Sequence, residues 1–323
     1  MHAPVATELD HVVQCLADSR AVDDKIAIKA AYAPALETLR GATRIGDDCA
    51  AIPDGSGGYL LFAAEGLLQR FVVDDPWFAG YSAVMVNLSD VAAMGGRSLA
   101  IVDVIWTPDV EESTAVWDGM KAAAEAYRIP VVGGHTTLTR EPGPIYLATA
   151  VLGKATRLLS SFDAEPGDDL LMAVDLNGSY RGDKPFWNAS TGAAPEHVRA
   201  IMELLPEIAE GGLCRSAKDI SNGGIVGTIV MLLECSAVGA SIDLAALPRP
   251  RDVDLVQWLL SFPSFGYLLS VSSANSEQVI RHFASQDIAC KVVGEITREP
   301  RLELRLDGQS RVFWEASSAR ANA

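Results

Sequence analysis

The chain has 323 residues, a formal net charge of -16 and 49% hydrophobic residues. This length allows two domains, and the hydrophobic content excludes a disordered chain. The acidic balance argues against nucleic acid and anionic membrane surfaces as partners, because both reward basic patches. A polyphosphate ligand would need bridging metal ions, since the protein has few cations to offer. Simple solubility is the alternative explanation of the acidity.

Cysteine usage and the N-terminal residues predict a cytoplasmic protein. The five cysteines are scattered and never spaced as Cys-x-x-Cys, which favours reduced thiols over a zinc site or a disulfide framework. Residues 1–10 have neither a basic region nor an apolar core segment, so they do not look like a signal peptide. The apolar run at 225–233 is too short to cross a bilayer.

Apolar periodicity and turn signals predict the elements of the first half. They are, in chain order, helical segments at 8–39, a hairpin with arms at 50–53 and 59–65, a buried helix at 81–94, a strand at 99–106, a helix at 110–128, a short extended segment at 129–132 and a strand at 145–152. The apolar run at 99–106 predicts a strand covered on both faces. Asp109 is the expected N-cap of the helix that follows it, and Gly133-Gly134 is the expected turn after the extended segment.

The second half repeats this mixture after a polar stretch at 154–169, which indicates a domain junction. Its predicted elements are a strand at 170–174, a loop at 177–194, a helix at 195–210, a tight loop at 217–224, a helix at 225–235, a strand at 240–244, helices near 252–260 and 277–285, and strands near 267–271, 291 and 302. The interspersed helices and strands predict an α/β or α+β fold. The expected domains are residues 1–155 and 156–323.

The helix at 81–94 carries two polar residues, Asn87 and Asp90, on one face of an otherwise apolar segment. A buried carboxylate is costly unless it is paired or bound to metal, and Asp90 also lies near the negative end of the helix dipole. Hydrogen bonds to a neighbouring loop are one explanation, and a metal or ligand is the other.

Further acidic residues stand at the ends of predicted elements or in apolar surroundings. They are Asp47, Asp48, Glu65 and Asp219. Taken singly, each is explained as a turn residue or an exposed strand end. Taken together with Asp90, they suit Mg²⁺, which binds one or two carboxylates along with phosphate oxygens and water.

Several segments resemble the superfamily of aminoimidazole ribonucleotide (AIR) synthetase. Residues 72–76 and the Asn-x-x-Asp-x-x-x-Met-Gly-Gly pattern at 87–96 are similar to selenophosphate synthetase. The segments at 46–50, 220–223 and 238–244 are similar to thiamine-monophosphate kinase. The superfamily also includes a hydrogenase maturation protein. The resemblance implies a two-domain fold whose N-terminal domain forms a barrel with its copy in a homodimer, and an ATP cleft in which aspartates hold the phosphates through Mg²⁺.

The resemblance also implies roles for particular residues. Metal ligands are expected at Asp48 with Asp47 beside it, at Asp90, at Asp219 and, with a longer side chain than the usual aspartate, at Glu65. The expected nucleotide-binding residues are Asn87, Gly133, Gly134, His135 and Asn222, and a simple hydrogen-bond donor in a turn is the alternative role of His135. At position 222 the kinase has an aspartate, so one metal ligand is lost there. The cysteine and lysine of selenophosphate synthetase have no counterpart, and the histidine of the kinase substrate loop falls near Gln69.

The predicted function is an Mg²⁺-dependent, ATP-using enzyme that phosphorylates or activates a small molecule. No catalytic base and no acceptor can be named from the sequence. The loop at 177–187 is either a substrate-side element or a plain surface loop. Two alternatives stay open: a nucleotide-binding regulatory or partner protein that has lost turnover, suggested by Glu65 and Asn222, and a purely structural dimeric protein.

Overall fold

Two β-sheets divide the chain into two units. The computed structural model describes residues 7–27 and 44–316. The five-stranded unit consists of residues 48–158 and 190–211. The seven-stranded unit takes the described residues among 1–47, 159–189 and 212–323. Each unit is thus assembled from separate stretches of sequence, whereas the expected domains, 1–155 and 156–323, are continuous; that division stays a prediction.

The five-stranded sheet has the order β1-β2-β5-β3-β4. Its strands are β1 (Ala50–Pro53), β2 (Tyr59–Gly66), β3 (Arg97–Thr107), β4 (Val131–Leu138) and β5 (Tyr146–Ala155). Only β3 and β4 pair in parallel. The predicted hairpin forms as β1 and β2, and its turn is held by the Asp54 carboxylate, which accepts hydrogen bonds from the backbone N–H groups of Ser56 (2.8 Å) and Gly58 (3.0 Å).

The same unit contains five helices. They are α4 (Gln69–Asp74), α5 (Pro76–Ala93), α6 (Thr114–Tyr127), α7 (Pro195–Met202) and α8 (Leu204–Glu210). Helix α5 begins earlier than predicted, because Asp75 caps it by accepting from the Phe78 N–H (3.3 Å) and Pro76 occupies its first turn. The prediction for α6 is wrong at its start. Asp109 accepts from the Glu112 N–H (2.9 Å) in a preceding turn, and Ser113 is the N-cap.

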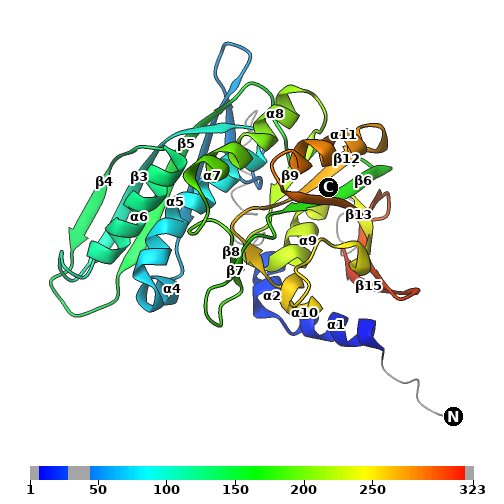
Figure 1. The fold of residues 1–323 in the computed structure, drawn as a ribbon, viewed down its shortest axis with the longest axis horizontal. Coiled ribbons are helices and arrows are strands. Elements are labelled where there is room, and N and C mark those ends of the chain that lie inside the picture. Colours follow the sequence, from blue (N-terminus) through cyan, green and yellow to red (C-terminus); the bar gives the residue numbers. More distant parts are fainter. Residues whose placement is uncertain (1–6, 28–43, 317–323) are drawn as a thin grey trace. The chain divides into compact units, whose positions relative to one another are not determined.

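Helices α5 and α6 lie side by side against the sheet (Figure 1). Their backbones approach closely at two glycines. A Cβ atom added to Gly80 would lie 2.0 Å from the Val116 carbonyl oxygen, and one added to Gly119 would lie 1.9 Å from that of Trp77. No side chain larger than hydrogen fits at this crossing, so the two glycines fix how near α6 comes to α5.

Residues 190–211 join the five-stranded unit through hydrogen bonds at buried and exposed positions. The Ser190 hydroxyl lies 2.7 Å from the Tyr81 hydroxyl and 2.8 Å from that of Tyr127, one on each of the crossing helices. At the surface, Arg97 forms an ion pair with Glu203 (2.6 Å). These contacts hold α7 and α8 beside α5, although more than 100 residues separate them from α5 in the sequence.

Two predictions for the strands of this unit need correction. Gly133 and Gly134 do not form a turn but lie within β4. Strand β3 was expected to be covered on both faces, yet only alternate residues such as Ile101 and Ile105 are buried, while Val102 and Trp106 on the other face are 39% and 40% exposed.

The seven-stranded sheet has the order β15-β14-β10-β13-β6-β12-β9. Its strands are β6 (Asp168–Val174), β9 (Ser216–Asp219), β10 (Gly239–Asp243), β12 (Gly266–Ser272), β13 (Ala289–Thr297), β14 (Arg301–Leu306) and β15 (Gln309–Glu315). The seven-stranded unit also contains a small three-stranded sheet, formed by β7 (Ser179–Tyr180), β8 (Phe186–Asn188) and β11 (Phe262–Pro263). The predicted loop at 177–194 therefore includes two short strands, the predicted loop at 217–224 begins inside β9, and β15 was not predicted.

Helices pack on both faces of this sheet. They are α1 (Glu8–Ala17), α2 (Arg20–Ala27), α9 (Gly224–Ser236), α10 (Leu255–Leu259) and α11 (Ser273–Ala284), with a short 3-10 turn, η1 (Leu244–Ala246). Residues of α1, α9 and α10 share one apolar core with alternate residues of β6, and α11 contacts β6, β12 and β13. Residues 28–39 of the predicted N-terminal helical segment lie outside the described residues. Within the described ranges, no helix combines the length and hydropathy needed to cross a bilayer.

The α5–α6 crossing makes a testable prediction. Replacing Gly119 by alanine should destabilise the protein by about 2 kcal/mol or more, because overpacking a close contact outweighs the roughly 1 kcal/mol by which alanine favours a helix over glycine. Urea denaturation followed by circular dichroism measures the change. The control is Gly192→Ala, where no atom lies within 4 Å of the added methyl group. Equal stability of both variants would contradict the prediction.

Candidate functional site

Helix α5 is fixed on the sheet by a buried set of hydrogen bonds around Asn87. The Asn87 side-chain amide donates to the Ala83 carbonyl oxygen (2.9 Å) and to the Thr149 hydroxyl of β5 (2.8 Å). The Thr149 hydroxyl in turn donates to the Ala83 carbonyl oxygen (2.8 Å). Asn87 is fully buried, so these bonds give it a positioning role. Its nucleotide-binding role stays a prediction.

Asp48 and Asp90 lie close together in the five-stranded unit. A carboxylate oxygen of one lies within 4.8 Å of a carboxylate oxygen of the other. The Cys49 N–H donates to the Met94 sulfur (3.2 Å), which ties the residue after Asp48 to the end of α5, and Asp90 lies one turn earlier on that helix. Asp90 is 7% exposed and Asp48 is half-buried. Two carboxylates this close repel each other unless a cation or a proton lies between them.

Asp47 has a different environment from its neighbour Asp48. Its carboxylate accepts hydrogen bonds from the Ser160 hydroxyl (2.8 Å), the Ser161 N–H (3.0 Å) and the Ser161 hydroxyl (2.6 Å). These donors, all in the seven-stranded unit, are the kind that stabilise an ionised carboxylate without a metal. These hydrogen bonds tie the Asp47 segment to the segment at Ser160 and Ser161. The role of Asp47 as a metal ligand stays a prediction.

Four residues form one lateral row across the face of the five-stranded sheet that α5 covers. Strand pairing places Glu65 of β2 opposite Thr149 of β5, Thr149 opposite Asp103 of β3, and Asp103 opposite Gly134 of β4. Directly paired residues point to the same side of a sheet. The row therefore links the predicted residues Glu65 and Gly134 through Thr149, which binds Asn87. Glu65 itself is exposed.

Asp103 was not predicted as a site residue, although an acid in the middle of an apolar strand was a visible signal. Its side chain is 2% exposed, and burial raises the pKa of its carboxyl group. The neighbouring Gly134 leaves room for it, because a Cβ atom on that residue would lie 2.1 Å from the Asp103 Oδ1. Gly134 is thus required by packing against Asp103.

His135 lies on the opposite face of the sheet from Gly134. It pairs with Val104, and Gly133 pairs with Val102 on that same face. Among the residues that the structure describes, this face carries exposed apolar side chains. Its exposed large side chains are Ile52, Phe62, Val102, Trp106, Tyr146 and Leu152. The predicted nucleotide-binding segment 133–135 therefore faces two ways, with Gly134 toward α5 and His135 toward the exposed apolar face.

The seven-stranded unit holds the other two predicted residues. Asp219, at the end of β9, is 5% exposed, and Asn222 is exposed in the turn before α9. Gly223 makes this turn with a φ of 111° and serves as the helix N-cap. Lys218, beside Asp219, is 2% exposed and is the only buried lysine or arginine among the described residues.

Comparison with known proteins identifies the family. Residues 46–155 match the family "AIR synthase related protein, N-terminal domain", and residues 171–307 match "AIR synthase related protein, C-terminal domain". The chain belongs to the AIR synthase related family. Family membership, predicted from the sequence, is confirmed, and so is the mixed α/β fold with two domains.

Three relatives place this member among its neighbours. The chain is 44% identical to an uncharacterized protein of Synechocystis sp. over 85% of this chain and 84% of that protein. It is 30% identical to thiamine-monophosphate kinase of Salmonella typhimurium over 68% of this chain and 73% of the kinase. It also resembles the solved structure of Thermotoga maritima PurL complexed with ATP, with a TM-score of 0.70 and 18% identity over 85% of this chain. The match spans 45% of that PurL chain, and at this identity it shows the fold alone.

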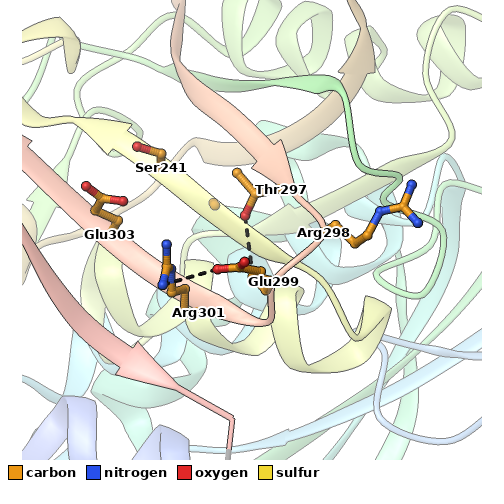
Figure 2. A pocket seen from close by; sticks show the side chains of 7 residues that line it. Ser241, Thr297, Arg298, Glu299, Arg301 and Glu303 are labelled. Atoms are coloured by element: carbon orange, nitrogen blue, oxygen red, sulfur yellow. Dashed lines mark hydrogen bonds and ion pairs between the residues drawn. The ribbon is translucent and has the colours of Figure 1, made fainter.

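One pocket of this family member lies in the seven-stranded unit and contains none of the predicted residues. It has a volume of about 330 Å³, and its lining includes Ser241, Thr297, Arg298, Glu299, Arg301 and Glu303. Figure 2 shows the Arg301 guanidinium directed at Glu299, with which it forms an ion pair (3.1 Å), while Arg298 extends away from the others. Because the central charges neutralise each other, we assign no ligand to this pocket.

A second groove, of about 500 Å³, lies in the five-stranded unit. It is lined by Gln69, Val72, Val73, Pro76, Glu112, Gly143, Pro144 and Ile145. Gln69 stands where the resemblance aligns the substrate loop of thiamine-monophosphate kinase. The groove is mostly apolar, and Gln69 and Glu112 are its only side chains that can make strong hydrogen bonds.

Two adjacent glycines allow a matched test of the Asp103 packing. Gly134→Ala should destabilise the protein by about 1–3 kcal/mol, because its methyl group would overlap the Asp103 carboxyl group. Gly133→Ala should be close to neutral, because no atom lies within 4 Å of the added methyl group. The measurement is the midpoint of urea unfolding for both variants. A loss of stability in Gly133→Ala equal to that in Gly134→Ala would contradict the assignment.

Proposed function

We propose that this protein is an Mg²⁺-dependent ATP-binding enzyme that transfers phosphate from ATP to a small molecule. The observation that carries the proposal is the close pair of Asp48 and Asp90 carboxylates, one of them buried at the end of α5. Mg²⁺ binds through one or two carboxylates and keeps phosphate oxygens and water as its other ligands. The pair is therefore matched to a metal–nucleotide complex, and the metal would supply the positive charge that the -16 protein lacks.

Phosphate transfer fits the chemistry of such a site. The reaction needs positioning and charge neutralisation more than covalent participation of the protein. Two relatives also support the proposal. One is named a thiamine-monophosphate kinase, an enzyme class that transfers phosphate, and the PurL structure is a complex with ATP. The acceptor is an unidentified small molecule, and the groove beside Gln69 is our candidate for its binding site.

The structure supports the other predicted metal ligands to different degrees. Asp219 is retained as a metal ligand because it is a buried carboxylate at a strand end. Glu65 reaches the same sheet row as Asp103 and is retained as an outer ligand. Asp47 is given the lowest weight, because Ser160 and Ser161 already bind its carboxylate. The nucleotide-binding roles of Gly133, His135 and Asn222 rest on the family resemblance.

The second candidate function is a nucleotide-binding regulatory or partner protein without turnover. Glu65 and Asn222 motivate it, because both depart from the aspartates expected at their positions and thereby alter the predicted metal shell. The two functions differ in one measurement. Incubation with ATP, Mg²⁺ and a metabolite pool should release ADP if the protein is an enzyme, whereas Mg²⁺-dependent ATP binding without ADP release would favour the regulatory function.

Asp90→Asn tests the metal site. The substitution keeps the size of the side chain and removes one negative charge, so the fold should persist while ATP binding in the presence of Mg²⁺ weakens at least about tenfold, the range typical for losing part of a metal site. Isothermal titration calorimetry with ATP, performed with Mg²⁺ and with EDTA, measures the effect.

The matched control is Asp118→Asn, which removes the same charge from the exposed surface of α6 in the same unit. It should bind ATP as the unmodified protein does. If Asp90→Asn retains full affinity, or if EDTA leaves the affinity of the unmodified protein unchanged, the proposed metal role of Asp90 is wrong.

We also propose that the protein is a homodimer through the exposed apolar face of the five-stranded sheet. Six large apolar or aromatic side chains, between 39% and 51% exposed, gather on this face, from β1, β2, β3 and β5. Contiguous apolar patches on a protein surface mark interaction sites. A second copy is the occupant we favour, because the family resemblance implies a barrel formed by two N-terminal domains. His135 on this face would then lie at the dimer interface.

Trp106→Glu tests the dimer. Each interface would receive two copies of the unpaired carboxylate, whose burial is strongly unfavourable, so the protein should dissociate into monomers. Size-exclusion chromatography with light scattering measures the mass. Val110→Glu is the control, because Val110 is 66% exposed but lies beyond the end of β3. A monomeric unmodified protein at micromolar concentration would contradict the proposal.

A further inference from the structure

Asp103 is a buried acid that the proposed metal site does not use. Both of its carboxylate oxygens are shielded from solvent and have no hydrogen-bond partner among the described residues other than the backbone N–H of Asp103 itself. Ile101 and Ile105, on either side of it along the same face of β3, are fully buried. An ionised carboxylate in such surroundings would be strongly unfavourable, and a buried group of this kind usually takes up a proton instead.

The elements packed around Asp103 bring no positive charge to it. The titratable side chains that these elements bring to the Asp103 side of the sheet are the buried Tyr81 and Asp90 of α5, the buried Tyr127 of α6 and the exposed Glu65 of β2. His135 of the adjacent β4 points to the other face of the sheet. Burial is the main influence on the pKa of Asp103 and raises it, opposed only by a hydrogen bond from the backbone N–H of Asp103 itself.

The side-chain donors of Asn87 and Thr149 in the same region already have acceptors. Asn87 Oδ1 is also shielded and has no donor among the described residues, while the Thr149 hydroxyl already donates to the Ala83 carbonyl oxygen. Asn87 binds Thr149, and Thr149 pairs directly with Asp103. A proton on Asp103 would introduce a donor into a group of side chains that otherwise presents unsatisfied acceptors.

We propose that Asp103 is held as a neutral carboxylic acid and acts as a positioning residue for β4, which carries the predicted nucleotide-binding segment 133–135. The neutral group can lie against the backbone of Gly134, where there is no room for even a methyl group. An ionised group would draw water to the same place and separate β4 from β3. The positional part of this inference rests on the proposed function, but the protonation state does not.

Infrared difference spectroscopy of the full-length protein tests the protonation state directly. At neutral pH an ordinary aspartate or glutamate is ionised, so a protonated carboxyl group gives a C=O stretching band in an otherwise empty region. The band should be present in the unmodified protein and absent in Asp103→Asn. It should persist in Asp54→Asn, because hydrogen bonds from Ser56 lower the pKa of Asp54 to about 2. A spectrum without the band at neutral pH would overturn the proposal in favour of an ionised Asp103 held by a cation or water.

The pH dependence of stability provides a second readout with a known sign. Because the pKa of Asp103 is raised in the folded state, its protonation favours folding at low pH, and this stabilisation is lost as the pH rises through the folded-state pKa. Asp103→Asn, which cannot ionise, should therefore gain in melting temperature relative to the unmodified protein as the pH increases. Asp54 has a lowered pKa, so Asp54→Asn should show the opposite trend, losing relative stability as the pH rises. Parallel curves for Asp103→Asn and the unmodified protein would overturn the proposal.

The affinity for ATP, measured against pH, tests whether Asp103 also positions β4, in addition to being protonated. Asp103→Asn preserves the neutral shape, so its affinity for ATP with Mg²⁺ should match that of the unmodified protein at neutral pH and fall less at high pH. Equal decline in both proteins would refute the positioning role. Failure of the Asp90→Asn test would remove the proposed function and leave the infrared result standing, so the two ideas fail separately.

Discussion

The contact on which the five-stranded unit depends is the buried hydrogen bonding between α5 and β5. Helix α5 is apolar on nearly every side, and apolar packing alone would allow it to rotate or slide along the sheet. Asn87 removes that freedom, because its amide has two partners, the Ala83 carbonyl oxygen and the Thr149 hydroxyl, and losing them would leave buried polar groups unsatisfied. Once Asn87 is fixed, Asp90 follows one turn later at a defined place beside Asp48.

The same unit contains carboxylates in three distinct environments, and comparing them clarifies what each can do. Asp54 accepts hydrogen bonds from Ser56 and Gly58 and is stable as an anion without help from a metal. Within residues 7–27 and 44–316, Asp103 has no donor apart from its own N–H and no cation beside it, so a proton is its simplest means of neutralisation. Asp48 and Asp90 lie beside each other, one half-buried and one buried, and two neighbouring acids of this kind are suited to a divalent ion. Only the last environment calls for a ligand from outside the chain.

The sequence predicts the parts of this fold that depend on local chemistry. The β1–β2 hairpin follows from its Asp-Gly-Ser-Gly-Gly turn, and the burial of α5 follows from its composition. Gly133 and Gly134 were expected to form a turn because glycine pairs usually do. Instead they pair with Val102 and Asp103 of β3, and the missing side chain of Gly134 leaves room for the Asp103 carboxyl group. The distinction between Asp47 and Asp48 likewise depends on Ser160 and Ser161, which no local pattern connects to them.

The two faces of strand β3 have different surroundings, and this difference bears on the proposed dimer. Its continuous apolar run predicts coverage on both faces, and the helices of its own chain cover one. The other side carries Val102 and Trp106, which are exposed among the described residues, and strand pairing places His135 on that side, while Gly134 and Asp103 face the helices. A nucleotide-binding role for segment 133–135 therefore requires β4 to serve two surfaces at once. If a second copy covers the open face, its surface will border His135, and the predicted nucleotide-binding segment will be complete only in the dimer.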